Sequence, residues 1–273
     1  MIQRILTLCR YLFFNQLFSL SGAIFTIATF IYYFLAFQQP TPEIDYFILV
    51  ICLFGGALSL LVTLSVATRA HMAASYPFFT RLPNRVEYLI AILITSLIYA
   101  TTLEIILATL ALWRHGPQLT INWALIIPPL WLAVNLVMST LALHATDLVT
   151  KEWSRTYIFT TLAVFLLSQT PSPAANQWLV DIIRQTARWF QSQDQTALFT
   201  YLQNFSTKVE DHIIGNTLGT LFWPFKAIAD GTINGSFTRP QALAPALLIL
   251  YATFLFLLAA DFLATKDLHL IEE

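Results

Sequence analysis

Uncharged apolar runs of about twenty residues recur along this 273-residue chain, and they constrain its fold more than any other feature. The first of them, residues 17–37, contains no Asp, Glu, Lys or Arg. A helix of about 20 apolar residues crosses the ~30 Å hydrocarbon core of a bilayer. Charged residues make up 11% of the chain, about half of the ~25% that is usual in soluble domains. The sequence therefore predicts an all-α polytopic membrane protein.

The apolar runs predict six transmembrane helices in a single permease-like domain over residues 1–273. The predicted spans are residues 17–37, 46–67, 88–112, 123–143, 157–170 and 242–260. The fifth run reaches only about 21 Å at 1.5 Å per residue, which is short for a full crossing. Pro128 and Pro129 are expected to kink or break the fourth span.

Two further regions are predicted to be helical without spanning the membrane. Residues 1–16 place apolar side chains at helical spacing, which predicts an N-terminal interfacial helix in contact with membrane lipids, or an extension of the first span. Residues 171–241 contain amphipathic stretches and an apolar stretch interrupted by glycine and proline. They predict a helical, partly re-entrant outer region between spans five and six.

The distribution of Lys and Arg predicts the orientation of the chain. Short segments on one predicted side hold eight basic residues, whereas the short loops on the other side hold only Arg114. Because cytoplasmic loops are enriched in Lys and Arg, both termini are expected in the cytoplasm and the protein in the inner (plasma) membrane. A net charge of −1 gives no basis for nucleic-acid binding.

Residues 69–87, between the second and third predicted spans, have an unusual composition for a connecting loop. The segment reads RAHMAASYPFFTRLPNRVE and places an aromatic pair, Phe78 and Phe79, among basic residues. A basic loop that only fixes orientation accounts for the arginines but not for the aromatic pair flanked by prolines. We therefore interpret the segment as a short helix with an apolar end, exposed to the cytoplasm as a docking surface.

This segment resembles the cytoplasmic turn between the second and third membrane helices of ABC-2 type permeases, the membrane subunits of a class of ABC exporters. The family pattern has an Arg, a small helix, two apolar residues and then Pro-x-Arg-x-Glu. The residues at or beside these places are Arg69, Phe78, Phe79, Arg81, Pro83, Arg85 and Glu87. The chain departs from the pattern at Thr68, where an acidic residue is common. The resemblance implies that these residues form a coupling helix that packs on a cytoplasmic ABC ATPase subunit. It also implies a second permease subunit, identical or different, and export of an unidentified substrate.

The chain lacks the GxxxxGK[ST] motif of a P-loop, so ATP and Mg²⁺ are expected on the partner ATPase, and no cofactor or metal and no enzymatic activity are expected on this chain. A second interpretation is a membrane enzyme or scaffold acting on lipids, with Glu104, His144 and Asp147 near the interface. A third is a channel-like or assembly protein that has no ATPase.

Glu104 is a carboxylate inside the third predicted span. It either faces the translocation pathway and contacts cargo or a proton, or bonds to a neighbouring helix. In the second span, Gly55, Gly56 and Ser59 form a small-residue face where another helix can approach closely. Cys9 and Cys52 are interpreted as small apolar residues that form no disulfide.

Overall fold

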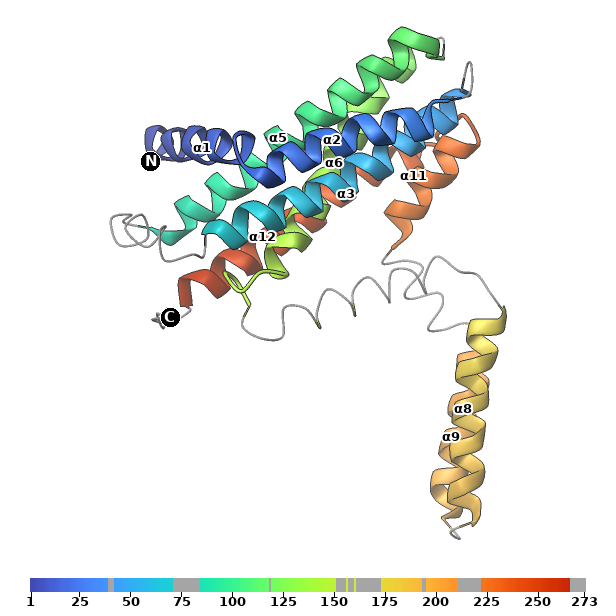
Figure 1. Ribbon diagram of the computed structural model, residues 1–273. Coiled ribbons are helices and arrows are strands. Elements are labelled where there is room, and N and C mark those ends of the chain that lie inside the picture. Colours follow the sequence, from blue (N-terminus) through green and yellow to red (C-terminus); the bar gives the residue numbers. More distant parts are fainter. Residues whose placement is uncertain are drawn as a thin grey trace. The chain divides into compact units, whose positions relative to one another are not determined.

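The computed structural model describes residues 1–38, 42–70, 84–117, 119–150, 156, 160, 173–192, 195–210 and 222–265, and every regular element within these residues is helical (Figure 1). In chain order the elements are α1 (Ile2–Leu17), α2 (Leu20–Ala36), α3 (Ile44–Ala70), α5 (Arg85–His115), α6 (Ile121–His144), α8 (Pro173–Ser192), α9 (Thr196–Glu210), α11 (Trp223–Ile233), η2 (Gln241–Leu243) and α12 (Ala244–Thr265). They fall into two compact units, one made of Met1–Ile158 with Ala227–Glu273 and the other of Phe159–Lys226.

Four of these helices are long and apolar enough to cross a membrane, and the pair of α1 and α2 is a fifth candidate if it counts as one broken span. The four are Ile44–Arg69, Arg85–Arg114, Trp123–His144 and Gln241–Thr265. The chain is thus an all-helical, multi-pass membrane protein, as the sequence predicts. Five of the six predicted spans correspond to these candidates. The remaining one, residues 157–170, lies outside the described residues except for Thr160.

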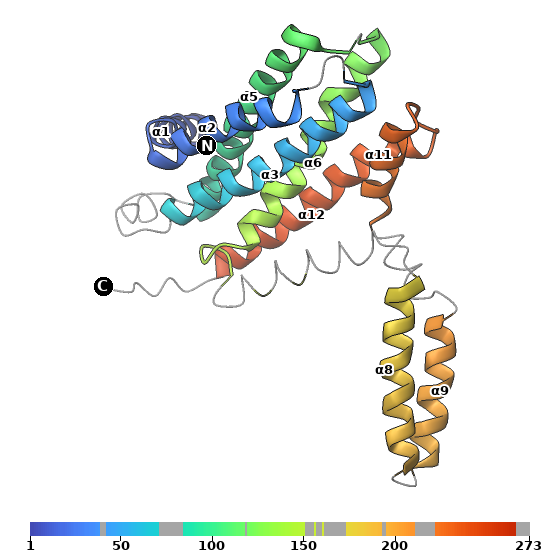
Figure 2. The ribbon, with the colours of Figure 1, turned by 45° about the vertical axis from the view of Figure 1, so that its right-hand side comes forward.

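The larger unit is a bundle in which α6 lies between α3 and α12, and α5 packs beside α3 (Figure 2). Its most buried apolar side chains come from α3, α5, α6 and α12, including Val62, Tyr88, Leu143 and Leu263, each 1% exposed or less. The helix α6 continues through Pro128 and Pro129, so the predicted break does not occur. Such prolines are tolerated in membrane helices because neighbouring groups satisfy the backbone bonds that they remove.

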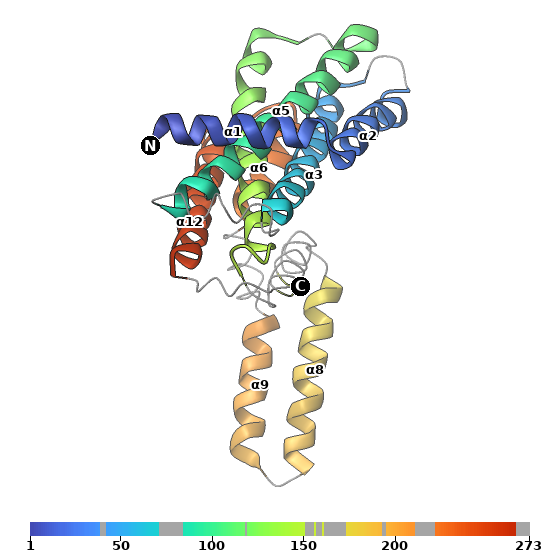
Figure 3. The same cartoon turned by 60° about the vertical axis from the view of Figure 1, so that its left-hand side comes forward.

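The N-terminal helix α1 crosses the bundle as a separate element and packs mainly on α5 (Figure 3). Its axis bends by 68° to that of α2. Ser19 caps α2 by accepting a hydrogen bond from the Gly22 amide at 3.0 Å. Gly22 is required at this bend because a Cβ there would overlap the carbonyl oxygen of Gln16. The predicted N-terminal helix is therefore present. It ends at a sharp bend that the Ser19 cap and Gly22 form.

The smaller unit contains α8 and α9, which pack against each other as a helical pair. Val180 and Ala187, two turns apart on α8, are buried, whereas Ile182 and Trp189 are exposed. The buried face of α8 thus includes Val180 and Ala187, and Ile183 and Phe190 are partly buried. The predicted re-entrant stretch covers residues 213–229. Its first part, up to residue 221, lies outside the described residues, and the rest includes the first turns of α11.

Candidate functional site

The structure describes the two ends of the segment 69–87, residues 69–70 and 84–87, and its centre lies outside the described residues. Phe78, Phe79, Arg81 and Pro83 belong to that centre. The C-terminal end of the segment forms the first turn of α5. There the Asn84 side-chain oxygen accepts a hydrogen bond from the backbone amide of Val86 at 2.9 Å. An Asn in this position is a favourable N-cap because it satisfies an amide that has no partner inside the helix. The Asn84 cap therefore fixes where α5 begins.

Glu87, the last residue of the family-like pattern, binds α1. The Arg4 guanidinium donates from Nε to Oε2 at 3.1 Å and from a terminal nitrogen to Oε1 at 3.0 Å. Glu87 is 4% exposed, whereas half of the Arg4 side chain remains accessible. Two parallel bonds fix both the distance and the orientation of the pair. The carboxylate thus attaches the N-terminal helix to the start of α5.

Arg69, the first residue of the pattern, binds the corner between α1 and α2. Its guanidinium donates to the hydroxyl groups of Ser21 and Ser65, the latter at 3.3 Å. Ser21 also accepts a hydrogen bond from the Gln16 amide at 3.2 Å and lies 2.9 Å from the Ser65 oxygen. We call the two contacts, Arg69 with Ser21 and Glu87 with Arg4, the N-terminal junction. Through it, both ends of the segment 69–87 are joined to the first two helices.

The junction partners Arg4, Ser21 and Ser65 were not among the residues that the sequence analysis selected. Arg4 was counted there only among the eight basic residues of the short segments on one predicted side. An excess of Arg on one face of α1, together with a Glu in the first turn of α5, is the only signal in the sequence that points to their pairing. Arg85, on the same turn as Glu87, is half-buried.

Glu104 lies in the interior of the bundle, 1% exposed, between α3 and α6. The Asn135 amide nitrogen donates to its Oε2 at 2.5 Å, and its other oxygen, Oε1, has no hydrogen-bond partner. The carboxyl group lies against Gly55, where a single added Cβ would overlap it. The small-residue face predicted for the second span is confirmed here, because α5 approaches it at Gly55. Asn135 was not predicted.

Of the three residues of the lipid-enzyme interpretation, Glu104 lies apart from His144. His144 is buried and its ring nitrogen donates to the Leu255 carbonyl on α12 at 2.8 Å. It follows Asn135, the partner of Glu104, by nine residues, or about 13 Å along α6. Asp147 is exposed, beyond the end of α6. His144 therefore joins two helices and does not share a site with Glu104.

Comparison with protein-family models, with curated proteins and with solved structures gives no significant match.

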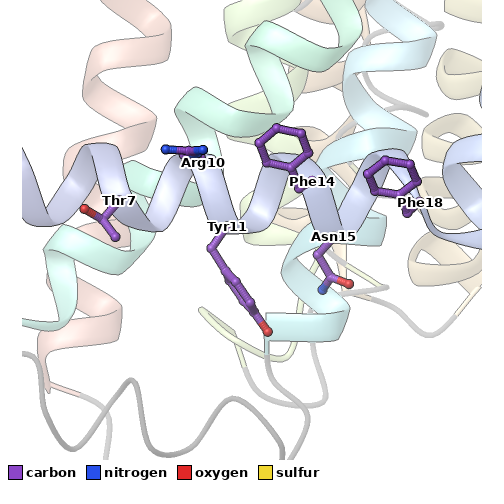
Figure 4. A pocket seen from close by; sticks show the side chains of 6 residues that line it. All are labelled: Thr7, Arg10, Tyr11, Phe14, Asn15 and Phe18. Atoms are coloured by element: carbon purple, nitrogen blue, oxygen red, sulfur yellow. The ribbon is translucent and has the colours of Figure 1, made fainter.

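The exposed surface of α1 carries a shallow pocket between two rows of side chains (Figure 4). One row is Thr7, Tyr11 and Asn15, and the other is Arg10, Phe14 and Phe18. The Arg10 guanidinium carbon lies 5.9 Å from the centre of the Phe14 ring, within the range of a cation–π contact. One helix and the residue that follows it supply the whole lining, so the pocket is a surface hollow of mixed polarity and not an enclosed ligand cavity.

No group of three His, Cys, Asp or Glu side chains with metal-binding geometry occurs among the described residues. The described part of the chain thus has two features with functional potential. The N-terminal junction connects both ends of the segment 69–87 to α1 and α2. The Glu104 cluster is a buried polar centre at the contact of three helices.

Proposed function

We propose that this chain is the membrane-spanning permease subunit of an ABC-2 type transporter, which couples to a separate cytoplasmic ATPase and pairs with a second permease subunit for export. ATP and Mg²⁺ bind on the ATPase, and no residue of this chain makes or breaks covalent bonds. The proposal rests on the segment 69–87, whose sequence resembles a coupling helix. The single observation that carries it is the N-terminal junction.

The junction supports a mechanical role for the segment. The segment follows α3 and leads into α5, so a force applied at its centre acts on two candidate spans at once. Arg69 and Glu87 extend the same connection to α1 and α2 through side-chain bonds. An ATPase that pushes on this segment would therefore move four helices together. A connecting loop with no mechanical function requires no such attachment.

Phe78 and Phe79 are the proposed anchors in the ATPase interface, with Arg81 and Arg85 around them. Aromatic side chains surrounded by arginines are typical of the residues that dominate binding energy, and truncation of such an anchor costs ~2 kcal/mol or more. The double variant Phe78→Ala/Phe79→Ala should insert normally but bind the ATPase at least about 30-fold more weakly, since ~1.4 kcal/mol corresponds to a factor of ten. The measurement is a pull-down of the partner from detergent, followed by its transport-linked ATPase activity.

An adjacent aromatic pair on α8 provides the matched control. Trp189→Ala/Phe190→Ala removes two neighbouring rings of similar size from the region expected on the opposite side of the membrane. This variant should retain the ATPase. Full retention of a coupled ATPase by the Phe78/Phe79 variant would contradict the coupling-helix assignment. Purification of the natural chain without any P-loop partner would instead favour the channel or lipid-enzyme interpretation.

The proposed orientation has its own test. A single cysteine introduced at Glu43 should react with a membrane-impermeant thiol reagent in intact cells, whereas one at Ser75 should react only after permeabilisation. The reason is the excess of Lys and Arg in the segments assigned to the cytoplasm. Cys9 and Cys52 are both buried, so they contribute little background. Reaction of the Ser75 position in intact cells would reverse the assigned orientation.

A further inference from the structure

Four buried side-chain oxygens near the contact of α3, α5 and α6 have no hydrogen-bond partner. They are Glu104 Oε1, Asn135 Oδ1, Ser59 Oγ and Ser139 Oγ, and each belongs to a residue that is 1% exposed or less. Most buried polar groups in folded proteins are paired, and an unpaired one is costly. Such a concentration of unpaired oxygens therefore requires an explanation other than packing.

The helices α3 and α6 run parallel, as two separate contacts show. The Trp131 indole donates to the Ile48 carbonyl at 3.4 Å, and further along Gly56 faces Val134 and Met138. Contacting positions in the two helices are separated by 78 to 83 residues in sequence. This narrow range of offsets fixes, to within about one turn, which parts of the two helices lie at the same level.

Ser59 and Ser139 are separated by 80 residues, so they lie at one level of the α3–α6 pair. Ser59 follows Gly55 by four residues, and Ser139 follows Asn135 by four. Each serine therefore lies one helical turn, about 6 Å along the axis, from the place where its helix meets Glu104. The carboxyl–amide pair and the two hydroxyls occupy consecutive turns on the same side of the two helices.

The composition of the cluster selects the kind of ligand. All four atoms are oxygens, which suit hard cations and not the softer transition metals. No described Lys, Arg or His forms an ion pair with Glu104. One carboxylate balances one positive charge, and an uncompensated charge of either sign is expensive inside the bundle. The cluster therefore matches a monovalent cation.

We propose that Glu104, Asn135, Ser59 and Ser139 form a binding site for one sodium ion. The bound ion pairs with the Glu104 carboxylate, accepts the unpaired oxygens as ligands and holds α3, α5 and α6 together. This site is a property of the chain alone and requires neither an ATPase nor a second permease subunit. A negative result for the sodium site therefore does not bear on the transporter assignment, and the reverse also holds.

The experiment measures thermal unfolding of the purified full chain in detergent at constant pH, with sodium chloride, potassium chloride or choline chloride at equal ionic strength. A ligand that binds only the folded state raises the midpoint in proportion to the logarithm of its concentration above Kd. Sodium should raise the midpoint in this way, potassium less and choline not at all. Equal midpoints in the three salts would overturn the proposal, and so would a response to pH with none to sodium.

Variants then locate the site. Glu104→Gln keeps the shape and the contact with Asn135 but removes the charge, so it should abolish the sodium response. Ser59→Ala and Ser139→Ala should each raise the sodium concentration of half-maximal effect by about 10-fold or more, the loss typical for supporting groups of metal sites. Ser96→Ala is the matched control, because Ser96 is equally buried on α5 but already donates to the Ile92 carbonyl at 2.9 Å.

The control should respond to sodium as the natural chain does. A sodium response that persists in Glu104→Gln would contradict the site. If Glu104→Gln does not fold, binding of radioactive sodium to the natural chain, Ser59→Ala and Ser96→Ala gives the same decision. One ion per natural chain and per Ser96→Ala chain, with weaker binding to Ser59→Ala, supports the proposal. No saturable binding to the natural chain rejects it.

Discussion

Gly55→Ala should destabilise the bundle by about 2–3 kcal/mol, the upper part of the range for inserting an extra methyl group into a packed core. The added Cβ would overlap the Glu104 carboxyl group. That group must then move, and its bond from the Asn135 amide at 2.5 Å is lost with it. The measurement is the midpoint of denaturant unfolding of the purified chain in detergent micelles, followed by its helical circular dichroism.

The neighbouring residue Gly56 supplies the control. A Cβ at Gly56 would lie 3.1 Å from a methyl carbon of Val134 and 3.5 Å from Met138. The Met138 contact is ordinary, and Val134 must shift by only a few tenths of an ångström, so Gly56→Ala should cost under about 1 kcal/mol. Gly55→Ala combined with Glu104→Ala should lose less stability than the sum of the two single variants, because residues in contact are coupled. Equal losses for the two glycine variants would mean that the carboxyl group does not lie against Gly55.

Breaking the N-terminal junction at Glu87 should release α1 from the bundle. Glu87→Ala removes a nearly buried carboxylate, but its partner Arg4 is half exposed, so the expected cost is between the values for surface and buried pairs, about 1–2 kcal/mol. The natural Cys9 reports this event, because it lies buried on α1 with its thiol 3.6 Å from the Ala91 carbonyl. Its reaction with a thiol reagent should accelerate about 10-fold, the factor that ~1.4 kcal/mol of easier opening produces.

Three comparisons make this result specific. The charge swap Arg4→Glu/Glu87→Arg should restore part of the protection of Cys9. Arg10→Ala, which removes an exposed arginine of the same helix that lies over the Phe14 ring, should leave the reaction rate unchanged. Cys52, buried in α3, should remain unreactive throughout. Acceleration at Cys52 as well would indicate general unfolding and not release of α1.

The spanning helices are predictable from sequence because a bilayer demands long apolar runs, but their ends are not. The second predicted span covers residues 46–67, whereas α3 covers Ile44–Ala70, and the third covers 88–112 against Arg85–His115. The last predicted span ends at residue 260, whereas α12 reaches Thr265. The hydropathy of the sequence identifies only the apolar part of a helix. The helix itself extends further, and at its N-terminus it begins after a capping residue, such as Asn84 before α5.

The contacts that carry the candidate site depend on tertiary packing and escape a reading of one sequence. Arg4 and Glu87 are 83 positions apart, and Glu104 and Asn135 are 31 apart. Gly55 and Gly56 predict that another helix approaches closely. The sequence around them does not identify Glu104 as the residue that does so. The aromatic pair Phe78–Phe79 is the reverse case, since its sequence signal is clear and its surroundings lie outside the described residues.

The prediction that α1 lies along the membrane interface implies that the corner between α1 and α2 affects how the protein responds to bilayer thickness. With α2 upright, the 68° bend leaves α1 about 22° from the membrane plane, and an ordinary span tilt of about 20° brings it nearly flat. Arg4 and Arg69 hold this geometry from two sides, so α1 cannot rise or sink independently of the bundle. In a thicker or thinner bilayer the mismatch must then be taken up by tilt of the bundle or by deformation of the lipid. Because α1 is attached to the bundle in this way, we expect its position at the membrane surface to fix the depth of the whole bundle in the bilayer.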